Sequence, residues 1–102
     1  RVEARDDFGL TAAELHLARC MALEGAPHGI RVNSLCPTFI ETPMTELFFR
    51  NPDFRATVLS KIKLGRLGTV EDLTGALILL ASDASSLMTG TSLVVDGGWT
   101  AE

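Results

Sequence analysis

The chain has 102 residues, of which 46% are hydrophobic and 22% are charged, and its formal net charge at pH 7 is −4. A chain of this length forms at most one domain, and its composition is typical of a globular protein rather than of a disordered one. The negative charge and the lack of a Lys/Arg cluster argue against nucleic acid or an anionic membrane surface as a partner.

A helix is predicted to begin at Thr11. Residues 1–10 are half charged and show no clear periodicity, so they predict no regular element. Thr11 and Glu14 have the spacing of a capping box, in which each side chain bonds the backbone amide of the other residue. Apolar residues then recur at helical spacing until Gly25 and Pro27 end the helix.

The segment 30–36, IRVNSLC, predicts a strand. It contains β-branched residues and is bounded by Gly29 and Pro37. Its apolar alternation is imperfect, which favours a strand covered on both faces, as in a parallel sheet. The string CPTFIETPM follows at 36–44, and its two prolines fix the backbone φ angle at two points.

The segment 43–63 is predicted to be a helical excursion rather than a plain loop. Thr45 is the type of residue that caps a brief helical turn, here TELFF. Asn51 and Pro52 supply a cap and a first-turn proline for a second helix, which is expected to extend to about Ile62.

A third helix and a second strand complete the predicted order. Thr69 and Asp72 repeat the capping-box spacing. The helix that follows is apolar almost all round between Leu73 and Ala81, which predicts burial on more than one side. The string TSLVV at 91–95 predicts a strand. A strand, a long crossover and another strand form a parallel, right-handed βαβ unit, so the predicted fold class is α/β.

Two stretches of the sequence resemble the C-terminal part of the short-chain dehydrogenase/reductase family. They read GIRVNSLCPTFIETPM and LGRLGTVEDLTGALILLASDASSLMTGTSLVVDGGW, and the resemblance covers residues 12–100. It implies that 1–102 is part of an NAD(P)-binding Rossmann domain, a doubly wound parallel sheet. The chain would supply the helix, strand, helical lid, helix and strand at the C-terminal end of that domain, with 1–10 unmatched.

The resemblance implies that the loop after the first strand lies against the nicotinamide of NAD or NADP. Backbone groups of Ile40 would bond the carboxamide, and the Thr42 hydroxyl would contact the carboxamide or the pyrophosphate. The family usually has glycine at the position of Thr38, so this chain adds a Cβ and a hydroxyl there. Ligands of open α/β sheets do bind beyond the carboxyl ends of strands, although the pattern alone also allows a turn that merely links two elements. The implied cofactor-binding residues are Pro37, Thr38, Phe39, Ile40 and Thr42.

The resemblance further implies that 43–63 is a lid over a small alcohol or carbonyl substrate. Its apolar side chains would cover the substrate, and plain packing is the alternative for each aromatic. The residues assigned to the lid are Met44, Phe48, Phe49 and Phe54. The helix Val70–Ser82 and the strand Thr91–Val95 match elements through which family members associate, which implies a homo-oligomer. DGGW at 96–99 resembles the family's usual ending, where glycines allow unusual backbone geometry.

The residues that perform the family's chemistry have no counterpart in this sequence. The family uses a Gly-rich turn, a Ser, and a Tyr with a Lys four residues later that lowers the Tyr pKa. This chain has no tyrosine and no GxxxGxG stretch. Counting back from Pro27 puts Asp7 and Thr11 at the Tyr and Lys positions, or Phe8 at the Tyr position if one deletion is allowed. We therefore expect no catalytic residue here and no activity from these 102 residues alone.

Two functions are open from the sequence. The first is hydride transfer between nicotinamide and an alcohol or carbonyl substrate, by an enzyme of which this chain forms a part. The second is a non-catalytic association module or a relic pseudoenzyme. Family-like sequence begins abruptly, which favours a truncated copy or a fragment of a longer chain. Such a chain is expected to be marginally stable in isolation, because the strand at 30–36 would expose a hydrophobic edge.

The histidines and cysteines predict neither a metal site nor a disulfide. His16 and His28 have no partner at metal or triad spacing. Cys20 and Cys36 lack CxxC spacing, which favours reduced thiols in a cytoplasmic protein. The longest apolar run, ALILLA at 76–81, is far shorter than the roughly 20 residues of a membrane span. No membrane partner is expected.

Overall fold

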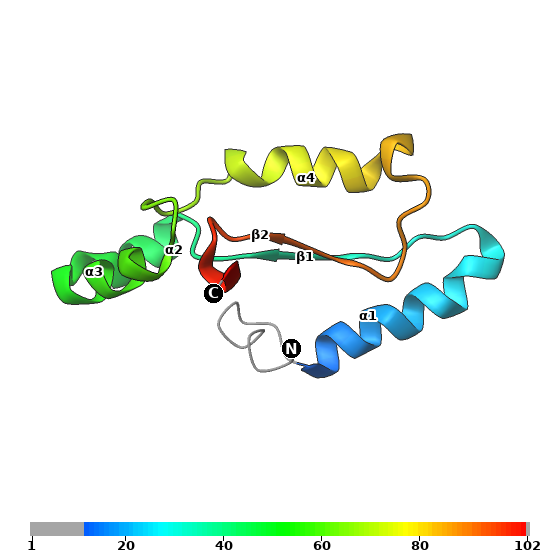
Figure 1. Ribbon diagram of the computed structural model, residues 1–102, viewed down its shortest axis with the longest axis horizontal. Helices are drawn as coiled ribbons and strands as arrows, with labels where there is room; N and C mark the ends of the chain where they lie inside the picture. The colour runs from blue at the N-terminus through cyan, green and yellow to red at the C-terminus, as the bar shows by residue number, and fades with distance from the viewer. Residues whose placement is uncertain (1–11, 102) are drawn as a thin grey trace.

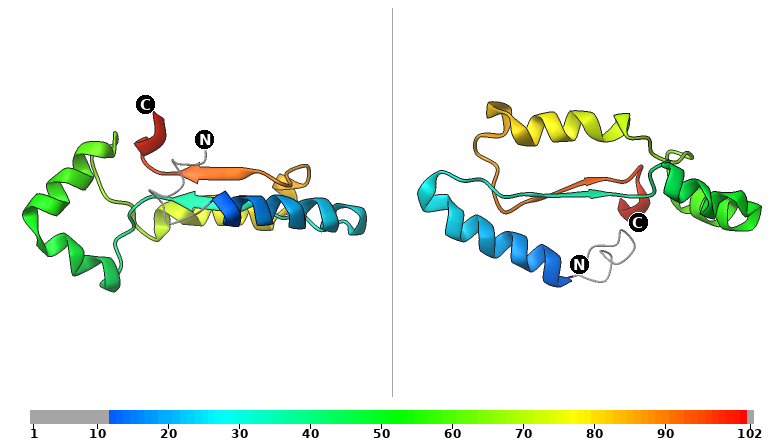
Figure 2. Two further views of the ribbon diagram at one scale, coloured as in Figure 1. Left: turned by 90° about the horizontal axis from the view of Figure 1, so that it is seen from below. Right: turned by 180° about the vertical axis from the view of Figure 1, so that it is seen from behind.

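The computed structural model describes residues 12–101 as a two-stranded parallel sheet with a helix on each face. Figure 1 shows α4 above the strands and α1 below them, and the right-hand view of Figure 2 shows the same three layers from behind. Two short helices, α2 and α3, project beyond the carboxyl ends of the strands. The elements are α1 (Ala12–Gly25), β1 (Ser34–Pro37), α2 (Pro43–Glu46), α3 (Pro52–Lys61), α4 (Glu71–Ala81) and β2 (Ser92–Val95). The α/β class with a parallel sheet is confirmed.

The two strands pair in parallel and are shorter than predicted. Ser34 lies opposite Ser92, and the ladder ends where Pro37 lies opposite Val95. Proline has no amide hydrogen and cannot continue the ladder as a donor. The strand predicted at 91–95 is therefore right to within one residue, whereas the strand predicted at 30–36 begins four residues too early.

Before Ser34, one backbone hydrogen bond remains between the two segments, from the Gly90 amide to the Val32 carbonyl at 2.7 Å, and side chains make the others. The Val32 amide donates to the Thr89 hydroxyl at 3.1 Å, and the Asn33 side-chain amide donates to the Met88 carbonyl at 3.0 Å. Asn33 also accepts from the Thr91 amide at 3.2 Å. Polar side chains that bond backbone groups offer the chain an alternative to sheet pairing. This alternative explains why residues 30–33 are bonded to the segment that leads into β2 without being part of the sheet.

The predicted helix starts differ in outcome. The predicted cap at Thr11 lies outside the described residues, which begin with α1 at Ala12. The Asn51 cap is confirmed, since its side-chain oxygen accepts from the amides of Asp53 and Phe54 at 2.9 and 3.3 Å. The prediction that Thr45 caps a turn is wrong.

Thr42 is the residue that caps α2. Its hydroxyl accepts from the Thr45 amide at 3.2 Å, and the Thr45 hydroxyl accepts from the Thr42 amide at 2.9 Å. This is a reciprocal capping box. Pro43 at the first helical position favours the same start, because its fixed φ suits a helix and its missing amide hydrogen would have had no partner there. Thr45 lies inside the helix.

Helix α4 has a hydrogen-bonded start. The prediction that it is buried on more than one side is wrong. The Asp72 carboxylate accepts from the Thr69 amide at 2.8 Å, so one half of the predicted capping box is present. No residue of α4 is fully buried, and Leu77 and Ile78 remain 54% and 62% exposed. Within the described residues a single sheet layer covers α4 on one side only, which leaves its outer face open. No helix among the described residues is long and apolar enough to cross a bilayer.

The carboxyl end of α4 is held by Arg31. Its guanidinium donates to the Leu80 carbonyl at 3.0 Å, to the Ser82 carbonyl at 3.3 Å and to the Ser85 hydroxyl at 2.8 Å. The last carbonyls of a helix have no partner within the helix, and a cation there also suits the helix dipole. Arg31 thereby fixes α4 to the chain that leads into β1.

The main hydrophobic cluster lies at the carboxyl end of the sheet rather than between its faces and the helices. Its buried members are Phe49, Val58, Ile62 and Leu67. Phe39, Leu59 and Trp99 pack against it. Cys36 of β1 is fully buried, as a central strand residue should be. The densest packing therefore surrounds the loop that follows β1.

Candidate functional site

The loop 37–42 leaves β1 and pairs briefly with the segment that returns from α3. Ile40 and Gly68 form an isolated parallel bridge. The Gly68 amide donates to the Phe39 carbonyl at 3.0 Å, and the Glu41 amide donates to the Gly68 carbonyl at 2.7 Å. These two bonds hold the loop extended just beyond the strand ends, where open α/β sheets bind ligands.

The peptide groups of Ile40 face away from Gly68. In a parallel bridge the residues on either side of the bridge position make the two bonds, so the amide and carbonyl of Ile40 itself point to the opposite side. The Ile40 carbonyl accepts from the Thr45 hydroxyl at 2.7 Å, which leaves one lone pair. No hydrogen bond among the described residues uses the Ile40 amide. A donor and an acceptor are thus presented side by side.

Gly68 lies close to the Ile40 side chain across this bridge. A Cβ built on Gly68 would lie 2.6 Å from Cδ1 of Ile40 and 3.4 Å from the Phe39 carbonyl oxygen. The first contact is far inside van der Waals distance, so a side chain at 68 would displace the terminal methyl of Ile40. The contact with the Phe39 backbone would be an ordinary van der Waals contact.

Thr42 lies at the end of the loop with a partly committed hydroxyl. The oxygen accepts from the Thr45 amide as part of the cap and lies 3.2 Å from the Thr45 hydroxyl oxygen. The Thr45 hydroxyl proton is directed to the Ile40 carbonyl, at 2.7 Å. The Thr42 hydroxyl proton can therefore be donated either to the Thr45 hydroxyl oxygen, at 3.2 Å, or to a ligand.

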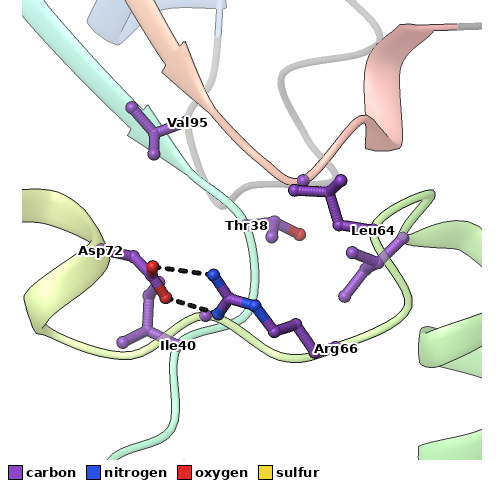
Figure 3. Close-up of a pocket in the computed structure, with 9 residues that line it drawn as sticks. Thr38, Ile40, Leu64, Arg66, Asp72 and Val95 are labelled. Carbon is purple, nitrogen blue, oxygen red and sulfur yellow. Dashed lines mark hydrogen bonds and ion pairs between the residues drawn. The ribbon is translucent and has the colours of Figure 1, made fainter.

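Thr38 and Ile40 lie together at a cavity at the carboxyl ends of the strands, as Figure 3 shows. The volume of this cavity is about 120 Å³. The cavity is lined by Thr38, Ile40, Ile62, Leu64, Arg66, Gly68, Asp72, Val95 and Gly97. The Thr38 hydroxyl oxygen is inaccessible and has no hydrogen-bond partner among the described residues. The hydroxyl that replaces the family's glycine is thus an unpaired polar group.

An ion pair forms another wall of this cavity. Arg66 donates to both carboxylate oxygens of Asp72, at 2.7 and 2.9 Å, as the dashed lines in Figure 3 mark. The hydrogen bond from Arg66, and then that from the Thr69 amide, hold the pKa of Asp72 well below its usual range. The same hydrogen bond raises the pKa of Arg66. The pair links the segment between α3 and α4 to the first turn of α4. The spacing of the two residues in the sequence does not predict this ion pair.

The predicted lid residues divide into two kinds. Phe49 is buried in the main cluster, with its ring 5.6 Å from both Phe39 and Phe54. Phe54 is 38% exposed, whereas Met44 and Phe48 are 74% and 63% exposed. Phe49 therefore packs, while Met44 and Phe48 present apolar surface outward from the excursion.

A groove of about 480 Å³ lies between the loop and the excursion. Its lining includes Glu41, Thr42, Pro43, Thr45, Glu46, Phe49, Arg55 and Leu67. The groove joins hydroxyls and opposite charges to apolar walls, as sites for small polar ligands do. Of the five predicted cofactor-binding residues, Thr42 alone is part of this lining. Thr38 and Ile40 line the smaller cavity instead, and Phe39 packs against other aromatic rings.

Sequence reasoning did not identify the contacts of Trp99. Its ring lies 5.7 Å from the ring of Phe39, and the Lys61 ammonium lies 5.5 Å from its centroid. The resemblance implies for DGGW a chain ending with unusual backbone geometry at its glycines, and no contact of Trp99. Its glycines at 97 and 98 have positive φ, and a Cβ at either would meet the 62–63 segment within 3 Å.

The histidines and cysteines form no metal centre. Nε2 of His16 lies 3.5 Å from Sγ of Cys20 on an exposed part of α1, and His28 lies in a turn. No group of three or more His, Cys, Asp or Glu side chains is placed to hold a metal ion in the part of the chain that the structure describes.

Comparisons with known proteins agree with this arrangement. A family model described as Enoyl-(Acyl carrier protein) reductase matches residues 10–100. The chain is 46% identical over 89 residues to galactitol 2-dehydrogenase of Rhizobium johnstonii, which covers 87% of the chain and 35% of that protein. It is 40% identical over 83 residues to D-erythrulose reductase of Gallus gallus, which covers 81% of the chain and 34% of that protein.

Solved structures share the fold. A short-chain type dehydrogenase/reductase of Mycobacterium marinum is 49% identical with a TM-score of 0.81, over 90% of this chain and 35% of that one. A protein of Agrobacterium tumefaciens described as a 2-deoxy-d-gluconate 3-dehydrogenase, solved with bound NADP, is 39% identical with a TM-score of 0.83, over 86% of this chain and 36% of that one. The chain spans about a third of the length of the curated relatives that it matches. The chain belongs to the short-chain dehydrogenase/reductase family of oxidoreductases, whose Rossmann fold it shares.

Proposed function

We propose that the loop 37–42 binds the nicotinamide end of NAD or NADP. The observation that carries this proposal is the pair of Ile40 peptide groups that faces away from Gly68. A carboxamide has an oxygen that accepts and an amide nitrogen that donates. The Ile40 amide would donate to that oxygen, and the Ile40 carbonyl would accept with its remaining lone pair. Thr42 would add a hydroxyl donor.

The excursion 43–63 is proposed to cover a small alcohol or carbonyl substrate. NAD(P), when bound, accepts or supplies the hydride. The exposed apolar side chains of Met44 and Phe48 would then exclude water above the substrate. Phe49 supports this role by anchoring the excursion in the hydrophobic cluster. Which alcohol or carbonyl compound binds depends on walls that these residues only partly form.

The acid that moves the proton is proposed to come from outside these residues. The sequence contains no tyrosine, and a tyrosine is the acid that the family resemblance implies. These 102 residues alone are therefore proposed to be inactive. The proposed role of these residues is to bind the carboxamide with the loop 37–42, to cover the substrate with the excursion 43–63, and to hold these two segments together.

NADPH binding by the natural polypeptide that carries these residues tests the proposal, with nicotinamide fluorescence as the readout. Thr42→Ser keeps the hydroxyl and should bind as the wild type does. Thr42→Asn keeps a good helix cap but removes the hydroxyl. It should weaken binding by about 2- to 12-fold, the range that one neutral hydrogen bond is worth. Thr74→Ala, on an exposed part of α4, is the matched control and should change nothing. Equal affinity of Thr42→Asn and the wild type would contradict the assignment of Thr42.

A non-catalytic association role is the second candidate, and the outer face of α4 favours it. Val70, Leu77 and Ile78 are 59%, 54% and 62% exposed, so this side presents unpartnered apolar surface. The helix at 70–82 and the strand at 91–95 are proposed to form a contact between copies of the chain. Stable self-association without any NADPH binding would favour this role alone over the first.

Substitution on α4 tests the contact. Leu77→Glu should convert the oligomer to monomers in light scattering, because a charge in an apolar interface is costly to bury. Leu87→Glu is the control, since Leu87 is 97% exposed in the turn after α4. An oligomer that survives Leu77→Glu would contradict the proposed contact. This result would not bear on the proposal that the loop binds the cofactor.

A further inference from the structure

The C-terminal turn at residues 96–100 sits between the loop that follows β1 and the base of the excursion. Trp99 faces the loop, with its ring 5.7 Å from that of Phe39. It also faces the end of α3, with the Lys61 ammonium 5.5 Å from its centroid. An aromatic pair and a cation above an aromatic ring both stabilise specific relative positions. One side chain therefore contacts both segments.

The backbone of this turn is also bonded to the segment that follows α3. The Leu64 amide donates to the Gly97 carbonyl at 2.9 Å. A Cβ on Gly97 would lie 2.7 Å from Ile62 Cγ2, and one on Gly98 would lie 2.8 Å from Lys63 Cβ. The approach is too close for any other residue at these two positions. The two glycines therefore serve a contact, and not only a turn.

The Asp96 carboxylate fixes the turn internally. It accepts from the Gly98 amide at 2.9 Å, from the Thr100 amide at 3.0 Å and from the Thr100 hydroxyl at 2.7 Å. The Asp96 carbonyl also accepts from the Trp99 amide at 3.2 Å. With both carboxylate oxygens engaged, the turn holds the Trp99 ring in one orientation. The turn is therefore held in place by its own hydrogen bonds.

Phe39 completes the connection. It lies between Thr38 and Ile40 in the loop, and its ring is 5.6 Å from Phe49 and 6.2 Å from Phe54. The loop, the excursion and the C-terminal turn thus meet in one aromatic group made of Phe39, Phe49, Phe54 and Trp99. Displacing any of these rings would move the segment that carries the Ile40 peptide groups.

We infer that Trp99 is a positioning residue that fixes the loop at 37–42 and the excursion at 43–63 relative to each other. Its effect on cofactor binding rests on the proposed function, because Trp99 acts through Phe39 and touches no cofactor itself. Its effect on the relative position of the two segments does not rest on the proposed function. The inference therefore has a structural arm and a binding arm that can fail separately.

Amide hydrogen exchange in the natural polypeptide tests the structural arm. Trp99→Ala should speed exchange at the Glu41 and Leu64 amides by about 2- to 12-fold relative to amides of α1, the range that an aromatic pair is worth. Trp99→Phe keeps a ring and should restore most of the protection. Arg31→Ala is the matched control, because it loosens α4 at its far end and leaves residues 96–100 intact. It should not single out Glu41 and Leu64.

NADPH titration of the same variants tests the binding arm. Trp99→Ala should weaken binding by a similar factor, while Trp99→Phe and Arg31→Ala should bind within about twofold of the wild type. Uniform loss of protection in Trp99→Ala, or unchanged exchange at Glu41 and Leu64, would overturn the inference. If the wild type binds neither NADH nor NADPH, the proposed cofactor loop fails, and the exchange result alone decides the role of Trp99.

Discussion

Ile40 and Gly68 face each other across an isolated parallel bridge, and a Cβ at position 68 would lie 2.6 Å from the end of the Ile40 side chain. The two hydrogen bonds of the bridge direct the peptide groups of Ile40 to the side away from Gly68. The geometry of the proposed carboxamide site therefore depends on a backbone contact with a residue 28 positions away in the sequence (68 − 40).

Gly68→Ala should displace the end of the Ile40 side chain. We expect a loss of about 1 kcal/mol in the free energy of unfolding, the low end of the range for overpacking, because the atom that must move is the terminal methyl of a flexible side chain. Gly75→Ala is the control: a Cβ there meets nothing within 4 Å in the interior of α4, so the change should stabilise by roughly 0.5–1 kcal/mol. Chemical denaturation measures both. Equal effects of the two substitutions would contradict the close approach.

Thr38→Val should make the protein more stable. Valine has nearly the shape of threonine but lacks the hydroxyl that is inaccessible and unpaired here. Removing an unsatisfied polar group recovers its desolvation cost, of about 1–3 kcal/mol. Thr38→Ser keeps the hydroxyl and removes a methyl, so it should not stabilise. A lower melting temperature for Thr38→Val would show that the hydroxyl has a partner.

Phe49→Ala should be the most damaging change in the excursion. Phe49 is buried and contacts two other rings, so a loss of about 3–5 kcal/mol is expected from the cavity and the lost contacts. Phe48 precedes it in sequence but is 63% exposed. Phe48→Ala should change stability by less than about 0.5 kcal/mol. Comparable losses for the two variants would contradict the placement of the excursion.

Asp96 should make stability depend on pH in the acid range. Burial by itself raises the pKa of Asp96, but the hydrogen bonds from Thr100 and Gly98 outweigh it, so the folded pKa lies below the ordinary value of 3.8. Since the folded pKa is the lower one, the carboxylate stabilises the protein above pH 3.8, and this contribution is lost as the pH falls through the folded pKa.

Asp96→Asn isolates this contribution. It should lower the free energy of unfolding at neutral pH by about 1.5–3 kcal/mol, because hydrogen bonds to a charged acceptor are the stronger ones. The difference from the wild type should shrink as the pH is lowered through the acid range. The Thr100→Val variant loses only the hydroxyl donor and should show a smaller effect. A difference that stayed constant down to the acid limit would contradict the role of the carboxylate charge.

The parts of the fold that local signals control were predicted well. Asn51 followed by Pro52 marks the start of α3, and the string TSLVV at 91–95 marks β2 to within one residue. The Thr42 cap was missed in favour of Thr45, although Pro43 at the first helical position was a readable signal for the earlier start. Each of these features depends on residues within a few positions of one another.

The parts that depend on distant partners could not be predicted from pattern. The Arg66 and Asp72 pair has no periodic signature, and the contact of Phe39 with Trp99 joins residues 60 positions apart (99 − 39). The exposure of α4 also escaped prediction, because an apolar helix does not reveal how many layers cover it. The candidate loop itself was located by resemblance to the family. Its geometry came only with the bridge to Gly68.

Binding of the nicotinamide carboxamide by the Ile40 peptide groups can be observed by titrating the natural polypeptide with NADPH and recording nuclear magnetic resonance spectra of its backbone amides. The Ile40 amide should shift downfield and become protected from exchange at saturation, while amides of α1 should not change. Saturable binding that leaves the Ile40 amide unshifted and unprotected would contradict a hydrogen bond from Ile40 to the carboxamide.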